Sequence, residues 1–128
     1  MTVDGKPAYV WFVSPTQINL QAPDDMSTGT VPVVAKAGDS VVLVGAGFGP
    51  TTQPVPAGQV YSGATATANP VKPRINDASV TPSFAGLSGA GLYQINLTAP
   101  AGLGTGDVPL VATVGGVQTQ TGVAMSLQ

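Results

Sequence analysis

The chain repeats one segment of its own sequence, and this repeat limits its fold more than any other feature. Residues 17–23 read QINLQAP, and residues 94–100 read QINLTAP, 77 positions later. At the same offset, residues 28–29, 31–32 and 34–35 are identical to residues 105–106, 108–109 and 111–112. Self-similarity at a fixed offset indicates that one structural unit occurs more than once in a chain. The sequence therefore predicts two copies of a unit.

The pattern inside the repeat is that of a half-buried β-strand. Ile18 and Leu20 alternate with polar Gln17 and Asn19, so apolar residues recur at every second position. The Ala-Pro that follows ends the strand, because proline donates no ladder hydrogen bond. Along the whole chain we expect strands at residues 8–13, 17–22, 31–36, 40–44, 59–61, 71–75, 79–84, 93–98, 108–114 and 118–126. Short strands separated by glycine-rich turns, such as those at residues 86–91 and 115–116, are typical of a β-sandwich or barrel.

The two copies differ in length. A long strand-like stretch that begins at Ser40 precedes the second copy, whereas only residues 8–13 lead into the first. We therefore expect residues 1–37 to be a partial repeat, the C-terminal half of a unit, and residues 38–128 to be a nearly complete unit. One strand near the join, at residues 33–38, can serve both copies, and in the alternative arrangement the two parts merge into one sandwich.

The composition excludes several function classes. The chain of 128 residues has 8% charged residues, four cations, no cysteine and no histidine. A disulfide, a zinc finger, a thiol nucleophile and a Ser-His-Asp triad are therefore excluded. Four scattered cations are too few for a nucleic-acid-binding surface, and no apolar run approaches the roughly 18 residues of a membrane span. We expect no enzyme, no nucleic-acid partner and no membrane insertion, and residues 1–7 do not form a signal peptide.

A glycine-rich segment follows the strand expected at residues 40–44. Gly45, Gly47 and Gly49 superficially match a dinucleotide-binding fingerprint, but that chemistry needs a helix N-terminus directly after the glycines. The segment that follows, PTTQP, does not start a helix. We interpret the segment as a tight structural turn in which Phe48 plugs one end of the sandwich, with no cofactor.

Two adjacent carboxylates, Asp24 and Asp25, lie in the loop after the first Ala-Pro. Paired carboxylates can bind calcium or share a proton as an acid–base pair. The second copy has Ala101 and Gly102 at these positions, so the repeat does not require the acids. Because EF-hand spacing is absent too, we interpret Asp24 and Asp25 as a solvated turn, with a weak calcium site as the alternative, and we expect no catalytic residue.

The strand at residues 8–13 is apolar on both faces. Tyr9 and Trp11 share one face, and Val10 and Phe12 share the other. Such a strand favours burial inside the domain, and the alternatives are an oligomer interface and a platform for sugar rings. Tyr9, Trp11 and Phe12 are therefore the candidate interaction residues.

Several motifs together resemble a known family. The run GDSVVLVGAGFGP at residues 38–50 resembles the IPT/TIG type of immunoglobulin-like domain, in which a strand ends in a Gly-x-Gly-Phe-Gly turn. With residues 7–10, 14–19, 84–87, 91–96 and 111–117, the chain is most similar to the Solibacter-type C-terminal Ig-like domain of secreted acidobacterial proteins. The resemblance implies an all-β, immunoglobulin-like β-sandwich, here with an extra half-repeat at the N-terminus, outside the cell or at its surface and with no assigned activity. The family's longer spacer before the glycine-rich strand is missing here.

These observations predict a non-catalytic extracellular module that acts as a spacer or an adhesion domain. The first alternative is self-assembly, in which strands 8–13 and 17–22 complete a neighbouring chain as a swapped dimer or a fibre. The second is a polysaccharide-binding module or weak hydrolase, for which Asp39, Asp77 and Asp107 are present without any sequence pairing. We expect the partner to be another protein or a second copy, with polysaccharide as the alternative.

Overall fold

The computed structural model describes residues 2–3, 6–7, 9–14, 17–21, 33–56 and 58–128, and all regular structure within them is β-strand. The strands are β1 (Thr2–Val3), β2 (Lys6–Pro7), β3 (Tyr9–Ser14), β4 (Gln17–Gln21), β5 (Val33–Val34), β6 (Ser40–Gly45), β7 (Ser62–Ala66), β8 (Val71–Ile75), β9 (Ala78–Ser79), β10 (Phe84–Gly89), β11 (Leu92–Thr98), β12 (Gly106–Val114), β13 (Val117–Gln118) and β14 (Ala124–Leu127). The predicted all-β class is therefore confirmed.

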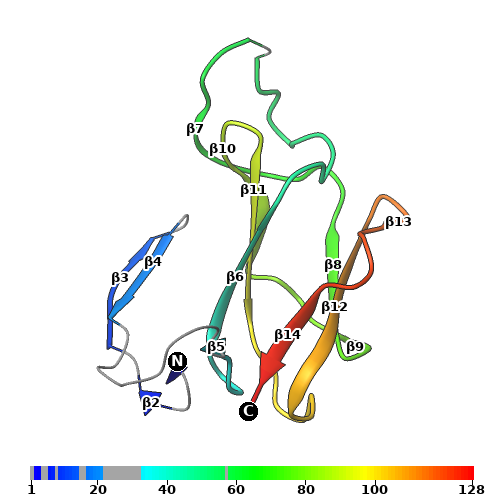
Figure 1. Cartoon of the computed structure of the whole chain (residues 1–128). Helices are drawn as coiled ribbons and strands as arrows, with labels where there is room; N and C mark the ends of the chain where they lie inside the picture. The colour runs from blue at the N-terminus through cyan, green and yellow to red at the C-terminus, as the bar shows by residue number, and fades with distance from the viewer. Residues whose placement is uncertain (1, 4–5, 8, 15–16, 22–32, 57) are drawn as a thin grey trace.

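Two antiparallel sheets form the main body of the molecule (Figure 1). The first sheet has the order β6-β11-β10-β7. The second has the order β13-β12-β8-β9, and β14 also pairs with β12. The pairing is regular except in β10, whose register with β11 and β7 shifts between Leu87 and Gly89. Alternate side chains of both sheets therefore point into the space between them over most of their length. The two packed sheets confirm the predicted β-sandwich architecture.

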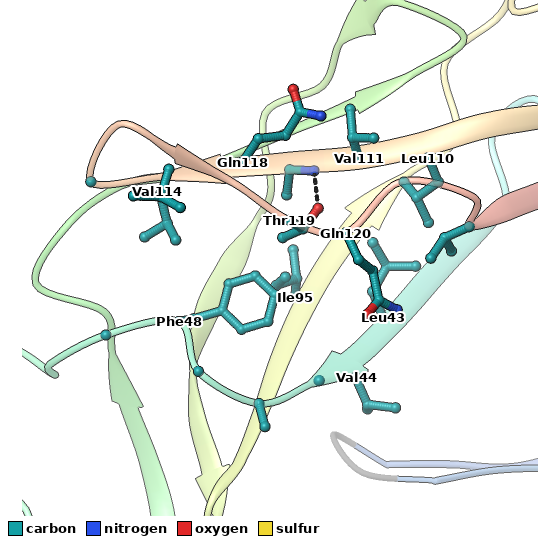
Figure 2. A pocket seen from close by; sticks show the side chains of 18 of the residues that line it. Leu43, Val44, Phe48, Ile95, Leu110, Val111, Val114, Gln118, Thr119 and Gln120 are labelled. Atoms are coloured by element: carbon teal, nitrogen blue, oxygen red, sulfur yellow. Dashed lines mark hydrogen bonds between the residues drawn. The ribbon is translucent and has the colours of Figure 1, made fainter.

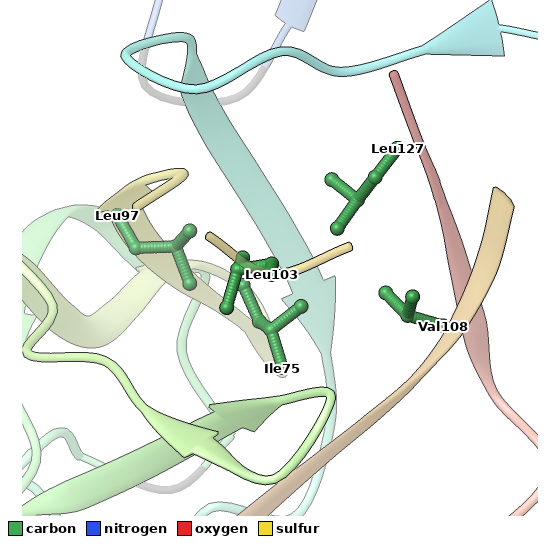
Figure 3. Close-up of a cluster of buried hydrophobic side chains, with 5 residues drawn as sticks. All are labelled: Ile75, Leu97, Leu103, Val108 and Leu127. Atoms are coloured by element: carbon green, nitrogen blue, oxygen red, sulfur yellow. The ribbon is translucent and has the colours of Figure 1, made fainter. Parts of the chain in front are cut away.

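The core lies between these sheets in two clusters. Figure 3 shows the larger one, which takes one residue or more from each sheet and consists of Ile75, Leu97, Leu103, Val108 and Leu127. Val71, Ile95 and Ala112 make up the smaller cluster. In β8 the apolar residues alternate with the exposed cations Lys72 and Arg74, so this strand has one buried and one solvent-facing side. The alternation in the sequence thus places the core correctly.

The sequence repeat is also a repeat of strand pairing. In the β3–β4 hairpin Phe12 lies opposite Asn19, and in the β10–β11 hairpin Phe84 lies opposite Asn96. The small sheet β2-β1-β5 has the same order and register as β9-β8-β12. Strands β1 to β5 therefore reproduce β8 to β12 in order and in pairing.

For part of the unit, the described residues of the first copy contain no counterpart. In the complete copy β11 also pairs with β6, and β10 also pairs with β7. Within the described residues β4 and β3 pair only with each other, as a separate hairpin (Figure 1). The hairpin thus has two strand edges at the places where its counterpart has neighbours.

The join between the copies is made by β5 and Ala35. β5 pairs antiparallel with β1, and the next residue, Ala35, forms a parallel bridge with Leu127 of β14. The amide of Ala35 donates to the Ser126 carbonyl, and the amide of Gln128 donates to the Ala35 carbonyl, both at 3.0 Å. One strand therefore contacts both copies, and the expected boundary between residues 37 and 38 falls in the turn that follows it.

Three strand predictions are wrong in position. The strand expected at residues 59–61 is found as β7, and the strand expected at residues 79–84 is found as β10, which begins at Phe84. The strand expected at residues 118–126 is two short strands, β13 and β14. Glycine and alanine dominate β7 and β10 and have low strand propensity, so the pattern marked Gly86 as a turn. Gly86 is instead a site of close approach, because a Cβ there would lie 2.2 Å from the Thr65 carbonyl oxygen.

Candidate functional site

A groove of about 550 Å³ lies between the two sheets. One wall is β6 with the turn that follows it, at residues 43–49, and the other is β12 with residues 117–123 (Figure 2). We call this hollow the edge groove. It lies beside β6, the strand at one end of the first sheet, so it opens at an edge of the sandwich.

The glycine-rich turn fixes one wall of the edge groove. Gly47 and Gly49 have φ values of 79° and 86°, which favour glycine, and between them Phe48 turns its ring towards Ile95 (Figure 2). The Phe48 ring packs on the smaller core cluster and lies 5.8 Å from the Tyr93 ring, at an interplanar angle of 44°. The Tyr93 hydroxyl donates a hydrogen bond to the Gly49 carbonyl. The structure thus places Gly45, Gly47, Phe48 and Gly49 in a packed turn.

The opposite wall is fixed by hydrogen bonds across the edge of β12. The Thr119 amide donates to the Ala112 carbonyl at 2.8 Å, and the Ala112 amide donates to the Thr119 hydroxyl oxygen at 2.9 Å (Figure 2). The Leu110 amide donates to the Val123 carbonyl at 2.9 Å. The Thr119 hydroxyl therefore holds this segment in place.

The chemistry of the edge groove is apolar and neutral. Its apolar lining includes Leu43, Phe48, Leu110 and Val123, and its polar side chains are amides and one hydroxyl. None of the described residues that line it is charged. The edge groove can therefore bury apolar side chains, and it offers no general acid or base.

Each of the three carboxylates in the described part of the chain has a local partner of its own. Asp39 accepts a hydrogen bond from the Lys36 amide at 3.0 Å, and Asp107 accepts one from the Ser126 hydroxyl. Asp77 lies 3.7 Å from the Arg74 guanidinium in a pair that is mostly exposed. No three acidic side chains gather in the ranges that the structure describes. Each of these three carboxylates is thus occupied in a local contact near a turn or strand end.

The other residues singled out in the sequence are placed only in part. Asp24 and Asp25, the alternative calcium ligands, lie outside the described residues. Tyr9, Trp11 and Phe12 lie in β3, whose described pairing is with β4 alone. Their role as interaction residues stays a prediction.

One buried polar residue was missed from the sequence. Ile95 and Leu97 face the core, so the alternation of the strand places Gln94 on the opposite face of the first sheet. Gln94 is nevertheless fully buried there. Its side-chain amide donates to the Asn96 side-chain oxygen at 2.7 Å, and its own oxygen accepts no hydrogen bond from the described residues. Gln17 and Asn19 repeat this pair in the first copy. The repeated Gln-x-Asn was the available signal, but alternation alone predicts solvent for such positions.

The chain matches no protein-family model, and comparisons with curated proteins and with solved structures return no match. The resemblance to IPT/TIG-type domains therefore stays a prediction. In the ranges that the structure covers, no helix is long and apolar enough to cross a membrane.

Proposed function

We propose that the chain is a non-catalytic immunoglobulin-like module of an extracellular or cell-surface protein, with a structural or adhesive role. The observation that carries the proposal is the strand order. In this proposal β6-β11-β10 would be strands B-E-D and β8-β12-β14 would be strands C-F-G of an immunoglobulin-type sandwich, with β7 as an addition to the first sheet. The strand that ends at Ala35 enters this sandwich parallel to the last strand, β14.

The side-chain chemistry supports a non-catalytic role. The edge groove is lined by apolar and neutral polar residues in the described chain, and the three described carboxylates are tied into separate local contacts. Two carboxylates of a glycosidase need to lie about 5–9.5 Å apart across a cleft. The sequence also contains no cysteine, a common catalytic nucleophile, and no histidine, the most common general base.

The location outside the cell and the partner are supported by composition and by the repeat. Low charge and many small polar residues are the features that the chain shares with secreted bacterial β-modules. A hairpin whose edges lack neighbours within the described residues supports a protein partner or a second copy. Polysaccharide binding is the alternative, and it would use Tyr9, Trp11 and Phe12 as a stacking surface.

An activity and binding panel tests this proposal. The purified chain is assayed with ester, glycoside and phosphate substrates, and in parallel on a glycan array. We expect no saturable turnover and no specific glycan binding. Saturable turnover that is lost in D39N, D77N or D107N would overturn the non-catalytic role. Glycan binding that is lost in W11A would show that the chain binds polysaccharide, and the proposed adhesion to protein would then be wrong.

A further inference from the structure

One edge of strand β6 has no neighbour in the part of the chain that the structure describes. Within the described residues β6 pairs along its six positions with β11, and it ends the sheet order β6-β11-β10-β7. Its sequence, SVVLVG, contains no proline and no charge, and its register with β11 has no bulge. Proline, charges and bulges are the devices that normally protect a sheet edge from pairing with another chain. The edge of β6 therefore lacks these protective features.

Among the described strands, none occupies beside β4 the place that β6 occupies beside β11. In the complete copy β6 pairs with the QINL segment of β11, with Val44 opposite Gln94 and Leu43 opposite Ile95. β4 carries the same four residues, QINL, in the equivalent hairpin. Within the described residues its only partner is β3. The neighbour that β4 lacks among the described residues is thus a strand like β6, which pairs with the QINL segment of β11.

We propose that β6 of one copy binds β4 of a second copy as an additional antiparallel strand, so that β6 lies between two QINL strands. The first sheet would then continue from one molecule into the hairpin of the next. This contact between two copies goes beyond the proposed function, which assigns no binding surface to β6. It is also independent of whether the chain is catalytic, because the β6 edge contains no residue that the proposed function uses.

The edge groove supplies the space that such a strand needs. It lies along the second half of β6 and contains no charged residue among those described, and β4 is uncharged as well. Ile18 and Leu20 are alternate residues of β4, as Ile95 and Leu97 are of β11. An added β4 strand would direct this alternate pair into the groove beside Leu43, where Ile95 already packs from the other side. Because both partners are neutral, the association would depend little on salt.

Each copy carries one donor strand and one acceptor edge. Two copies can exchange both contacts and close as a twofold dimer, or they can connect head to tail as an open fibre. Both outcomes contain the same β4–β6 contact. The mass in solution tells them apart.

The test is light scattering over a dilution series with three variants. V44K places a charge on the acceptor strand at a position that is 59% exposed, and I18K places one in the donor strand. V60K is the matched control, because Val60 is 92% exposed and lies in the loop before β7. We expect the wild type and V60K to associate alike. V44K should lower the association constant at least about tenfold, and I18K should lower it about a hundredfold because its ammonium group would enter the apolar groove.

A mixing experiment separates a specific contact from damage to the fold. V44K keeps an intact β4, and I18K keeps an intact β6 edge, so an equimolar mixture should regain one of the two contacts and form a one-to-one heterodimer. A wild-type chain that stays monomeric at all concentrations would overturn the proposal, including the case in which its own β4 covers β6. Association that survives I18K, or a mixture that does not recover it, would equally overturn it, since the occupant would then not be β4.

The register can be measured directly because the chain has no cysteine. V44C chains are mixed with chains that carry a single cysteine at each position of β4 in turn. We expect disulfides at alternate positions of β4 only, as antiparallel pairing requires. Equal cross-linking at every position would contradict strand addition.

Discussion

Gly86 is the position at which one added methyl group tests the packing of the first sheet. A Cβ there would lie 2.2 Å from the carbonyl oxygen of Thr65 and 2.7 Å from the Phe84 ring. The Thr65 oxygen belongs to the backbone of β7, which pairs with β10 at this point. The first copy has Ser14 at the equivalent place, opposite Gln17, and the described residues provide no counterpart of β7 there. The glycine is thus required by β7 and not by the hairpin.

The size of the effect follows from this overlap. A Cβ at 2.2 Å stands about 1 Å inside ordinary contact with an atom that cannot rotate away. Either β7 moves out, which weakens the 3.0 Å hydrogen bond from the Thr67 amide to the Ala85 carbonyl, or β10 shifts and disturbs the core. Overpacking of this kind costs about 1–3 kcal/mol, and the lost pairing adds to it. We expect G86A to lower the free energy of unfolding by about 3 kcal/mol and Tm by roughly 10–15 °C.

The assay is urea denaturation followed by circular dichroism, with G89A as the matched control. A Cβ at Gly89 would meet its nearest neighbour, Leu92 Cβ, at 3.7 Å, which is ordinary contact. G89A should therefore change stability by less than about 0.5 kcal/mol or raise it slightly. If the G86A protein is as stable as G89A, β7 does not approach β10 as closely as the structure shows.

Two further substitutions and a protease digestion test other parts of the fold. I75A should lower the free energy of unfolding by about 3–4 kcal/mol in urea denaturation, because Ile75 is fully buried in the larger cluster, and a loss below about 1 kcal/mol would contradict that packing. D77G should raise Tm by a few degrees, because Asp77 has a φ of 63°, which favours glycine. The hydrogen bond from the Arg74 guanidinium to the carbonyl oxygen of residue 77 is kept in this variant. A lower Tm would show that the Asp77 carboxylate stabilises the fold more than glycine does at this φ. Limited trypsin digestion should cut first after Lys36, because Lys36 is exposed next to the turn at Gly38. Mass spectrometry should then find the fragments 1–36 and 37–128. A first cut after Arg74, which lies inside β8, would contradict the pairing of that strand.

The sequence predicts those strands well that are rich in β-branched and apolar residues, whether as a continuous run or in alternation with polar ones. The strand expected at residues 71–75 is β8, and those expected at 40–44, 93–98 and 108–114 differ from β6, β11 and β12 by one or two residues at an end. Glycine hides β7 and β10, because it adds no side chain to the pattern and marks turns more often than strands. The close approach of β7 explains why a glycine, Gly86, lies inside strand β10, and this approach is visible only in the folded structure.

The extent of the repeat could not be read from identity alone. A constant offset matches the copies only from residue 17 onward, because the first hairpin is shorter and shifts everything before it. The pairs Val3–Val33 and Ile75–Leu110 occupy equivalent places in the two copies but share little sequence. Strand pairing retains the relation because it depends on register and alternation, which tolerate such substitutions.

The candidate site could be predicted even less. The glycine-rich turn was expected from Gly45, Gly47 and Gly49, whereas the edge groove forms between β6 and residues 117–123, which are distant in the sequence. The burial of Gln94 likewise depends on its neighbours in space and not on its own strand. Both features arise from tertiary packing, which overrides local pattern.

The described strands within residues 2–35 repeat the pairing of residues 74–112, and nuclear Overhauser effects between backbone protons can verify this repeat in solution. We expect cross-strand contacts between residues 12 and 19 and between residues 3 and 33, matching those between residues 84 and 96 and between residues 75 and 110. Contacts in the second set without the first, or a first set in a different register, would contradict the repeat and with it the strand type that β6 is proposed to bind.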